Sequence, residues 1–193
     1  MVFGIVGGIG AGKSFVSQLI GEMGSAKIID TDKIGHQILL KDGEAYAKIV
    51  DIFGESILDT DKQIVRQKLA TIAFSNPQNV KLLNDITHPI IYNIVQTQIK
   101  QSPEKLILVE APLLIESGLI NIVDKVIAVY ADEDIRIERV IKRSGYTYDE
   151  AKARINNQKP WSELEKVGDI IINNSGGIND TKEQVSKLLK EVD

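Results

Sequence analysis

Five short apolar runs, separated by stretches with helical spacing, define the hydrophobic pattern of this 193-residue chain. Most of the runs are nearly free of polar residues, which is typical of strands buried on both faces of a parallel sheet. They lie at 2–6, 26–29, 105–109, 125–130 and 167–172. We therefore expect an α/β fold, a three-layer sandwich around a five-stranded parallel sheet.

A helical insertion is expected at about 41–102, where the chain has helical spacing and no strand pattern. Ala45, Ile49 and Phe53 share one helical face there. The segment 87–89, Thr-His-Pro, is expected to interrupt the pattern. One crossover between neighbouring strands needs less helix than this, so we expect the insertion to pack on one side of the sheet.

A second excursion lies between the fourth and fifth apolar runs. Arg136, Arg139 and Arg143 are spaced to share one face of a helix. In one interpretation, a helical hairpin at about 132–165 forms a lid whose arginines neutralise a moving phosphoryl group. In the other, the arginines are a solvated face that pairs with nearby acids such as Glu138, as charge runs usually do.

The composition predicts one soluble domain that spans 1–193, with its core at about 1–40, 103–131 and 166–193. The formal net charge is −4, from 23 basic and 27 acidic residues, which argues against nucleic acid as the main partner. The chain has no cysteine for disulfide or thiolate chemistry, and no apolar run long enough to span a membrane. We expect a cytoplasmic protein.

A phosphate-loop motif stands between the first predicted strand and the first predicted helix. It reads Gly7-Gly8-Ile9-Gly10-Ala11-Gly12-Lys13-Ser14 and matches the pattern G-x-x-x-x-G-K-[ST] in full. Its glycines let successive N–H groups converge on one anion, and the helix N-terminus adds positive potential. Lys13 is expected to reach the β- and γ-phosphates of a nucleotide, and the Ser14 hydroxyl to bind Mg²⁺.

Acidic residues follow two of the predicted strands, where ligands gather in open parallel sheets. Asp30 and Asp32 follow the second strand and Glu110 follows the third. Each has two interpretations: proton or metal chemistry beside the phosphate loop, or a helix-capping and helix-leading carboxylate. The sequence positions alone leave both open.

Three classes of phosphate-loop protein compete: a small-molecule kinase, a GTP-dependent switch, and a nucleotide-binding regulator without catalysis. The switch needs a guanine-selecting Asn-Lys-x-Asp after a late strand, and the chain has none. A regulator does not explain an acid, an insertion and a lid around one site. The small-molecule kinase is therefore favoured.

Within that class the chain resembles the dephospho-coenzyme A kinase family almost from end to end. The segments that carry the resemblance are 7–14, Asp-x-Asp at 30–32, Arg66, Leu-Asn-x-x-x-His-Pro at 83–89, Pro-Leu-Leu-x-Glu at 112–116, Arg139, Arg143, Gln158, and Asn-Ser-Gly at 174–176. The phosphate loop is shared by many families, but this series of motifs in this order is far more specific. One departure is His36, where the family often carries an arginine.

The resemblance implies that ATP, with Mg²⁺, phosphorylates the ribose 3′-hydroxyl of dephospho-coenzyme A; a nucleoside or nucleotide kinase is the alternative. It implies catalytic roles for Lys13, Asp32, Arg139 and Arg143. The implied ATP-binding residues are Gly8, Ile9, Gly10, Ala11, Gly12, Lys13, Ser14, Phe15 and Asn174, the last at the adenine edge. The implied acceptor-binding residues are Asp32, Arg66, His88, Pro112, Leu113 and Glu116. A histidine before proline is also commonly a capping or buried hydrogen-bonded residue.

Overall fold

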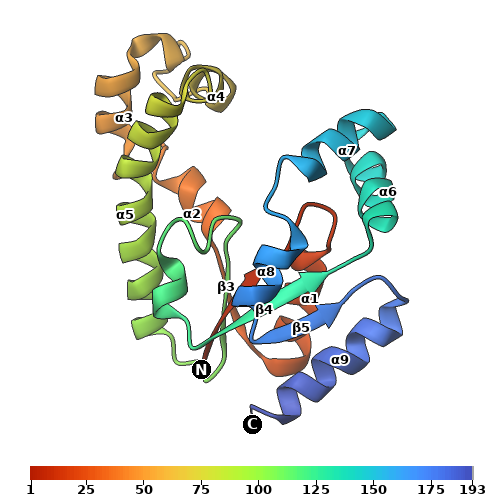
Figure 1. Cartoon of the computed structure of the whole chain (residues 1–193). Helices are drawn as coiled ribbons and strands as arrows, with labels where there is room; N and C mark the ends of the chain where they lie inside the picture. The colour runs from red at the N-terminus through yellow and green to blue at the C-terminus, as the bar shows by residue number, and fades with distance from the viewer. Residues whose placement is uncertain (193) are drawn as a thin grey trace.

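A five-stranded parallel sheet forms the centre of the computed structural model, which describes residues 1–192 (Figure 1). The strands are β1 (Val2–Val6), β2 (Lys27–Asp30), β3 (Ile107–Glu110), β4 (Lys125–Tyr130) and β5 (Ile170–Asn173). They are ordered β2-β3-β1-β4-β5, and every neighbouring pair is parallel. The predicted parallel sheet is therefore confirmed, and all five carboxyl ends lie at one edge.

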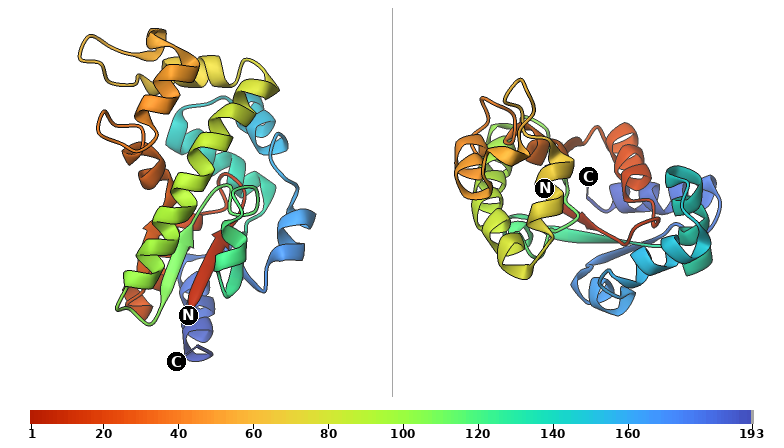
Figure 2. Two further views of the ribbon diagram at one scale, coloured as in Figure 1. Left: turned by 90° about the vertical axis from the view of Figure 1, so that its left-hand side faces the viewer. Right: turned by 90° about the horizontal axis from the view of Figure 1, so that it is seen from above.

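Helices cover both faces of this sheet, which confirms the predicted three layers (Figure 2). On one face, Phe3 and Ile5 pack with α1 (Lys13–Gly24) and α9 (Ile178–Lys190). On the other, Val6 belongs to a cluster that includes residues of the first helical excursion, such as Ile49 and Val95. Residues of β1 thus alternate between two cores, as the strand period of two requires.

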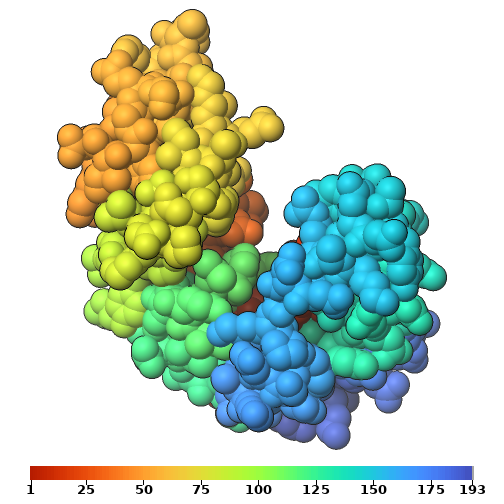
Figure 3. Space-filling view, turned by 45° about the horizontal axis from the view of Figure 1, so that its top comes forward, coloured from red at the N-terminus to blue at the C-terminus, as the bar shows by residue number. Residues whose placement is uncertain are grey.

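Two helical excursions rise above the carboxyl edge of the sheet, one from each half. The first contains α2 (Thr31–Gln37), α3 (Tyr46–Phe53), η1 (Glu55–Ile57), α4 (Arg66–Ala73) and α5 (Pro77–Gln101). The second contains α6 (Glu133–Ser144) and α7 (Tyr148–Asn156). The surface is hollowed between these two excursions (Figure 3).

Helix α5 differs from the sequence expectation, because it continues through the Thr-His-Pro segment. It runs unbroken from Pro77 to Gln101 with Pro89 inside it. Proline removes the hydrogen bond to the carbonyl of Asp85, one turn earlier. Asp85 is exposed, so water can satisfy that carbonyl. The predicted interruption at 87–89 is therefore wrong.

A short helix, α8 (Trp161–Val167), ends at the first residue of the expected fifth strand. Trp161, Leu164 and Val167 are partly buried against the sheet at helical spacing. The strand β5 consequently begins only at Ile170, three residues later than expected. A preceding 3₁₀ turn, η2 (Leu119–Ile122), buries Leu119 on the same side.

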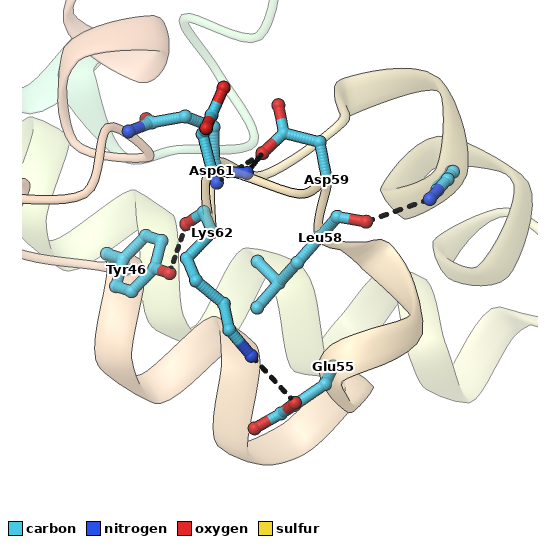
Figure 4. A network of polar contacts seen from close by, with 8 residues as sticks. Tyr46, Glu55, Leu58, Asp59, Asp61 and Lys62 are labelled. Atoms are coloured by element: carbon cyan, nitrogen blue, oxygen red, sulfur yellow. Dashed lines mark hydrogen bonds and ion pairs between the residues drawn. The ribbon is translucent and has the colours of Figure 1, made fainter.

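A polar network shapes the loop that leads into α4 (Figure 4). One carboxylate oxygen of Asp59 accepts from the amides of Asp61 at 2.9 Å and Gln63 at 2.8 Å. Lys62, with a positive φ of 60°, pairs with Glu55 at 3.1 Å. The carbonyl of Lys62 also accepts from the hydroxyl of Tyr46. The network fixes the path of the chain into α4, whose first residue is Arg66.

The N-cap of α5 gives a test of how strongly local signals stabilise the insertion. Asn76 accepts from the amide of Asn79 at 2.8 Å. We expect Asn76→Ala to lower the free energy of unfolding by about 1 kcal/mol. That corresponds to a melting temperature lower by roughly 2–4 °C for a domain of this size. Calorimetry beside the exposed control Gln78→Ala checks this, and equal melting temperatures for the two variants would contradict it.

Candidate active site

The phosphate loop connects β1 to α1 at the carboxyl edge of the sheet. Gly10 and Gly12 have φ values of 80° and 91°, which side chains rarely tolerate. A Cβ at Gly12 would also overlap the side-chain amide of Asn174. Within residues 1–192, the amides of Gly10, Gly12, Lys13 and Ser14 have no hydrogen-bond acceptor. Donors of this kind at a helix start form a site for an anion such as phosphate.

Three consecutive carbonyls of the same loop, those of Ile9, Gly10 and Ala11, are held by side chains from outside it. The carbonyl of Ile9 accepts from Nε of Arg136 at 3.0 Å. Arg139 donates to the carbonyls of Gly10 at 3.3 Å and Ala11 at 3.4 Å. Because these carbonyls are engaged by the lid helix α6, the loop is fixed with its amides available to a ligand.

Lys13, the first residue of α1, lies at the centre of the charges around the loop. Its Nζ donates to the carbonyl of Gly7 at 2.6 Å. Burial lowers the pKa of Lys13, while the neighbouring carboxylates of Glu110 and Asp32 act in the opposite direction. The lysine is therefore near both acids that sequence analysis left open.

The structure assigns different positions to the acids of the two strands. Asp30 is the N-cap of α2 and accepts from the amide of Lys33 at 3.1 Å. Glu110, at the end of β3, accepts from the hydroxyl of Ser14 at 2.7 Å. The capping interpretation thus holds for Asp30, and Glu110 stands next to the proposed metal ligand.

The side chain of Asp32 makes no hydrogen bond within residues 1–192 and lines a cavity instead. Burial raises the pKa of its carboxyl, and the nearby charge of Asp30 raises it further. The charges of His36 and Lys13 oppose this shift. A carboxyl with a raised pKa and an open side toward a cavity is suited to accept a proton.

That cavity, of about 300 Å³, lies between the insertion and the loop after β3. Its walls include Asp32, His36, Arg66, His88, Pro112 and Leu113, together with apolar residues of α4 and α5. Five of the six predicted acceptor residues are therefore brought together. Burial lowers the pKa of His88, against the charges of Glu116 and Asp85.

Glu116, the sixth predicted acceptor residue, lies in a different place. Its carboxylate pairs with Nζ of Lys159 at 2.7 Å. Both residues line a second cavity, of about 260 Å³, whose floor includes Gly7 and Gly8. The side chain of Glu116 is thus engaged by the segment that follows the lid.

The two lid arginines predicted to be catalytic differ in their surroundings. Arg139 is partly buried and also donates to the carbonyl of Asn174 at 2.9 Å. Arg143, one turn later, is exposed and has no hydrogen bond or ion pair within residues 1–192. Arg139 is therefore anchored to the phosphate loop, while the guanidinium of Arg143 is available to a ligand.

Asn174, expected at the adenine edge, has its side chain turned into the protein. It is only 4% exposed. Its amide group donates to the carbonyl of Ala11 at 2.8 Å, and its oxygen accepts from the hydroxyl of Thr181 at 2.9 Å. The side chain thus supports the phosphate loop from β5.

Several residues of the site had no assigned role in the sequence analysis. They are Gln158, Lys159 and Thr181, which contact the site from the lid or from α9. Arg136 was expected only as one of the lid arginines, and its bond to the Ile9 carbonyl was not predicted. Arg136 and Gln158 were noticed in motifs, but only the fold shows that they reach Ile9.

The donor set around Ser14 fits a magnesium ion. Ser14 and Glu110 supply hard oxygen ligands, which Mg²⁺ prefers. Among residues 1–192, no cluster of three or more acidic, histidine or cysteine residues could hold a metal alone. This suits an ion that is held largely by nucleotide phosphates and water.

None of the helices in the described part is both long and apolar enough to cross a bilayer.

Comparison with known proteins gives one consistent family. The family model described as Dephospho-CoA kinase matches residues 1–180. The chain is 40% identical to the Dephospho-CoA kinase of Carboxydothermus hydrogenoformans, over 98% of this chain and 93% of that protein. It is 39% identical to the Dephospho-CoA kinase of Geobacillus kaustophilus, over 100% and 97%.

Solved structures agree with the sequence comparison. The Dephospho-CoA kinase from Campylobacter jejuni is similar at a TM-score of 0.73 and 32% identity, over 99% of this chain and 96% of that one. Shikimate kinase from Acinetobacter baumannii is similar at a TM-score of 0.57 and 14% identity, over 99% and 92%. The second likeness shows a shared kinase fold alone.

Removing the Asn174 side chain tests its support of the phosphate loop. We expect Asn174→Ala to lower the free energy of unfolding by roughly 1–3 kcal/mol, because two buried partners lose their hydrogen bonds. Affinity for ADP should also fall as Ala11 loosens. Thr181→Val, which keeps the bond to Ala11, should retain ADP affinity. Urea unfolding and calorimetric titration check this, and unchanged ADP affinity in Asn174→Ala would contradict it.

Proposed function

The chain belongs to the dephospho-CoA kinase family, which uses ATP in the final step of coenzyme A biosynthesis, and on that premise we propose how its residues divide the reaction. The segment from Gly8 to Phe15 binds the phosphates of ATP, chiefly through the amides of Gly10, Gly12, Lys13 and Ser14, which have no acceptor within residues 1–192. Lys13 neutralises the β- and γ-phosphates. Ser14, supported by Glu110, holds Mg²⁺, which supplies neutralisation of phosphate charge when bound.

On the acceptor side, we propose that Asp32 accepts or orients the proton of the ribose 3′-hydroxyl. The cavity beside it takes the dephospho-coenzyme A molecule, with Arg66, His88, Pro112 and Leu113 as its walls. Glu116 acts from the neighbouring cavity, which shares Pro112 and Leu113 with the acceptor cavity, through its ion pair with Lys159. The mostly apolar lining suits the non-charged parts of a long acceptor.

On the lid side, we propose that Arg139 and Arg143 stabilise the charge of the transferring group and help to exclude water. Arg139 does so from a fixed position against the loop. Arg143 is free to move onto the phosphates when the lid closes. Asn174 contributes to ATP binding by supporting Ala11.

ATP and dephospho-coenzyme A are the partners that this proposal needs, and we place the reaction in the cytoplasm, where ATP is abundant. The observation that carries the proposal is the position of Asp32. Its carboxyl lines the acceptor cavity and also senses the charge of Lys13 in the phosphate loop. One group therefore lies between the donor and acceptor sites.

A coupled assay of ADP release tests the acceptor. With magnesium-ATP, turnover should depend on dephospho-coenzyme A and should be small with pantothenate, shikimate, gluconate or nucleoside monophosphates. Equal turnover of a nucleoside monophosphate would instead assign the chain to the nucleotide kinases.

The substitution Asp32→Asn separates a catalytic carboxylate from a structural one. It keeps the shape of the side chain but removes proton acceptance, so we expect kcat to fall by roughly 10²–10⁴-fold. The fold disfavours the charged form of Asp32. This charge therefore lowers the free energy of unfolding at pH values above the ordinary carboxyl pKa. The melting temperature at neutral pH should therefore not fall.

The raised pKa of Asp32 also fixes the direction of the pH dependence. A base works only when deprotonated, so the acidic limb of the wild-type kcat profile should lie above the ordinary Asp value of about 3.9. Asp32→Asn should lose that limb. A near-native kcat with an unchanged melting temperature would remove Asp32 from the mechanism.

A further inference from the structure

Ile9, at the tip of the phosphate loop, is held by the lid through its amide, its carbonyl and its side chain. Its N–H donates to Oε1 of Gln158 at 2.6 Å, and its carbonyl accepts from Nε of Arg136 at 3.0 Å. Its side chain packs on the apolar cluster of the lid, formed by Ile137, Val140, Ala151 and Ile155. The tip of the phosphate loop is therefore held by both polar and apolar groups of the lid.

The segment that carries Gln158 is itself anchored. It follows directly on Asn157, the C-cap of α7. The next residue, Lys159, pairs with Glu116 at 2.7 Å, and α8 then packs on the sheet, where the ring of Trp161 meets Tyr130 at 4.9 Å. Gln158 thus presents its oxygen to Ile9 from a fixed position.

The backbone holds the Gly8–Ile9 peptide group only at its carbonyl, which accepts from the amide of Ala11 at 3.1 Å. A second contact, at the N–H of Ile9, is needed to fix the orientation of this peptide group. The peptide group between Gly8 and Ile9 is flanked by glycines at 7, 8 and 10, so sterics restrict its rotation little. An N–H without an acceptor would be free to turn toward the anion. The inward amides of Gly10, Gly12 and Lys13 would then no longer converge at fixed positions.

We propose that Gln158 is a positioning residue for ATP, which holds the Ile9 amide outward so that the following amides face the phosphates. This rests on the proposed binding of ATP in the loop. Gln158 acts through Ile9 and not on the reacting atoms. It therefore affects the nucleotide side of the reaction and leaves the acceptor cavity unchanged.

The test is Gln158→Met, which keeps the length of the side chain and removes the strong acceptor. Loss of one hydrogen bond predicts a Kd for magnesium-ADP that is about three- to tenfold higher by calorimetric titration. The KM for ATP should rise to the same extent, while the KM for dephospho-coenzyme A stays within about twofold. The melting temperature without ligand should fall by no more than the roughly 2–4 °C expected for one lost hydrogen bond of an exposed side chain.

Asn157→Met is the matched control, since the Asn157 side chain makes no hydrogen bond within residues 1–192. It should bind magnesium-ADP as the wild type does. Wild-type affinity in Gln158→Met, an equal loss in Asn157→Met, or a parallel rise of both KM values with a lower melting temperature would each overturn the proposal. The ADP titration needs no acceptor, so its outcome is independent of whether dephospho-coenzyme A is the substrate.

Discussion

The orientation of the peptide groups in the phosphate loop is the constraint on which the site depends. An anion site made of backbone amides requires the carbonyls of the same residues to point elsewhere and to find partners there. Here Arg136, Arg139 and Asn174 supply those partners for the carbonyls of Ile9, Gly10 and Ala11. The second half of the chain therefore shapes a site whose motif lies entirely in the first fourteen residues.

The parallel sheet brings these distant groups together. Its register sets Asp30 opposite Glu110 on neighbouring strands, and Ile5 of β1 pairs with the same glutamate. The acids and the phosphate loop consequently meet at one edge, although about 80 residues separate Asp30 from Glu110. Asp30 caps α2, which leaves Asp32, two residues later, free to face the cavity.

The sequence predicted the strands, the two helical excursions and five residues that the fold brings to one cavity, because each depends on short-range periodicity or on a motif of fixed spacing. It failed where tertiary packing decides. Helix α5 passes through Pro89, since an exposed turn tolerates a lost hydrogen bond. Residues 161–167 form α8 because Trp161 and Leu164 find an apolar surface on the sheet. The side chain of Asn174 is likewise turned inward by two partners, Ala11 and Thr181, which no local sequence pattern identifies.

Two arginines one helical turn apart differ in how firmly they are held: Arg139 is bonded to the phosphate loop, whereas Arg143 is exposed. Arg139 is bonded to the loop and to the residue after β5, so its charge is present at the site even when no ligand is bound. A fixed charge of this kind costs little reorganisation during the reaction. Arg143 is exposed and unpaired within residues 1–192, although its charge already acts on Lys13 in the phosphate loop. If ATP binding alone placed both arginines on the phosphates, water could attack the γ-phosphate as readily as the acceptor hydroxyl does. In the proposed reaction, lid closure would bring Arg143 onto the phosphates only in an assembled site, and this would favour transfer over hydrolysis.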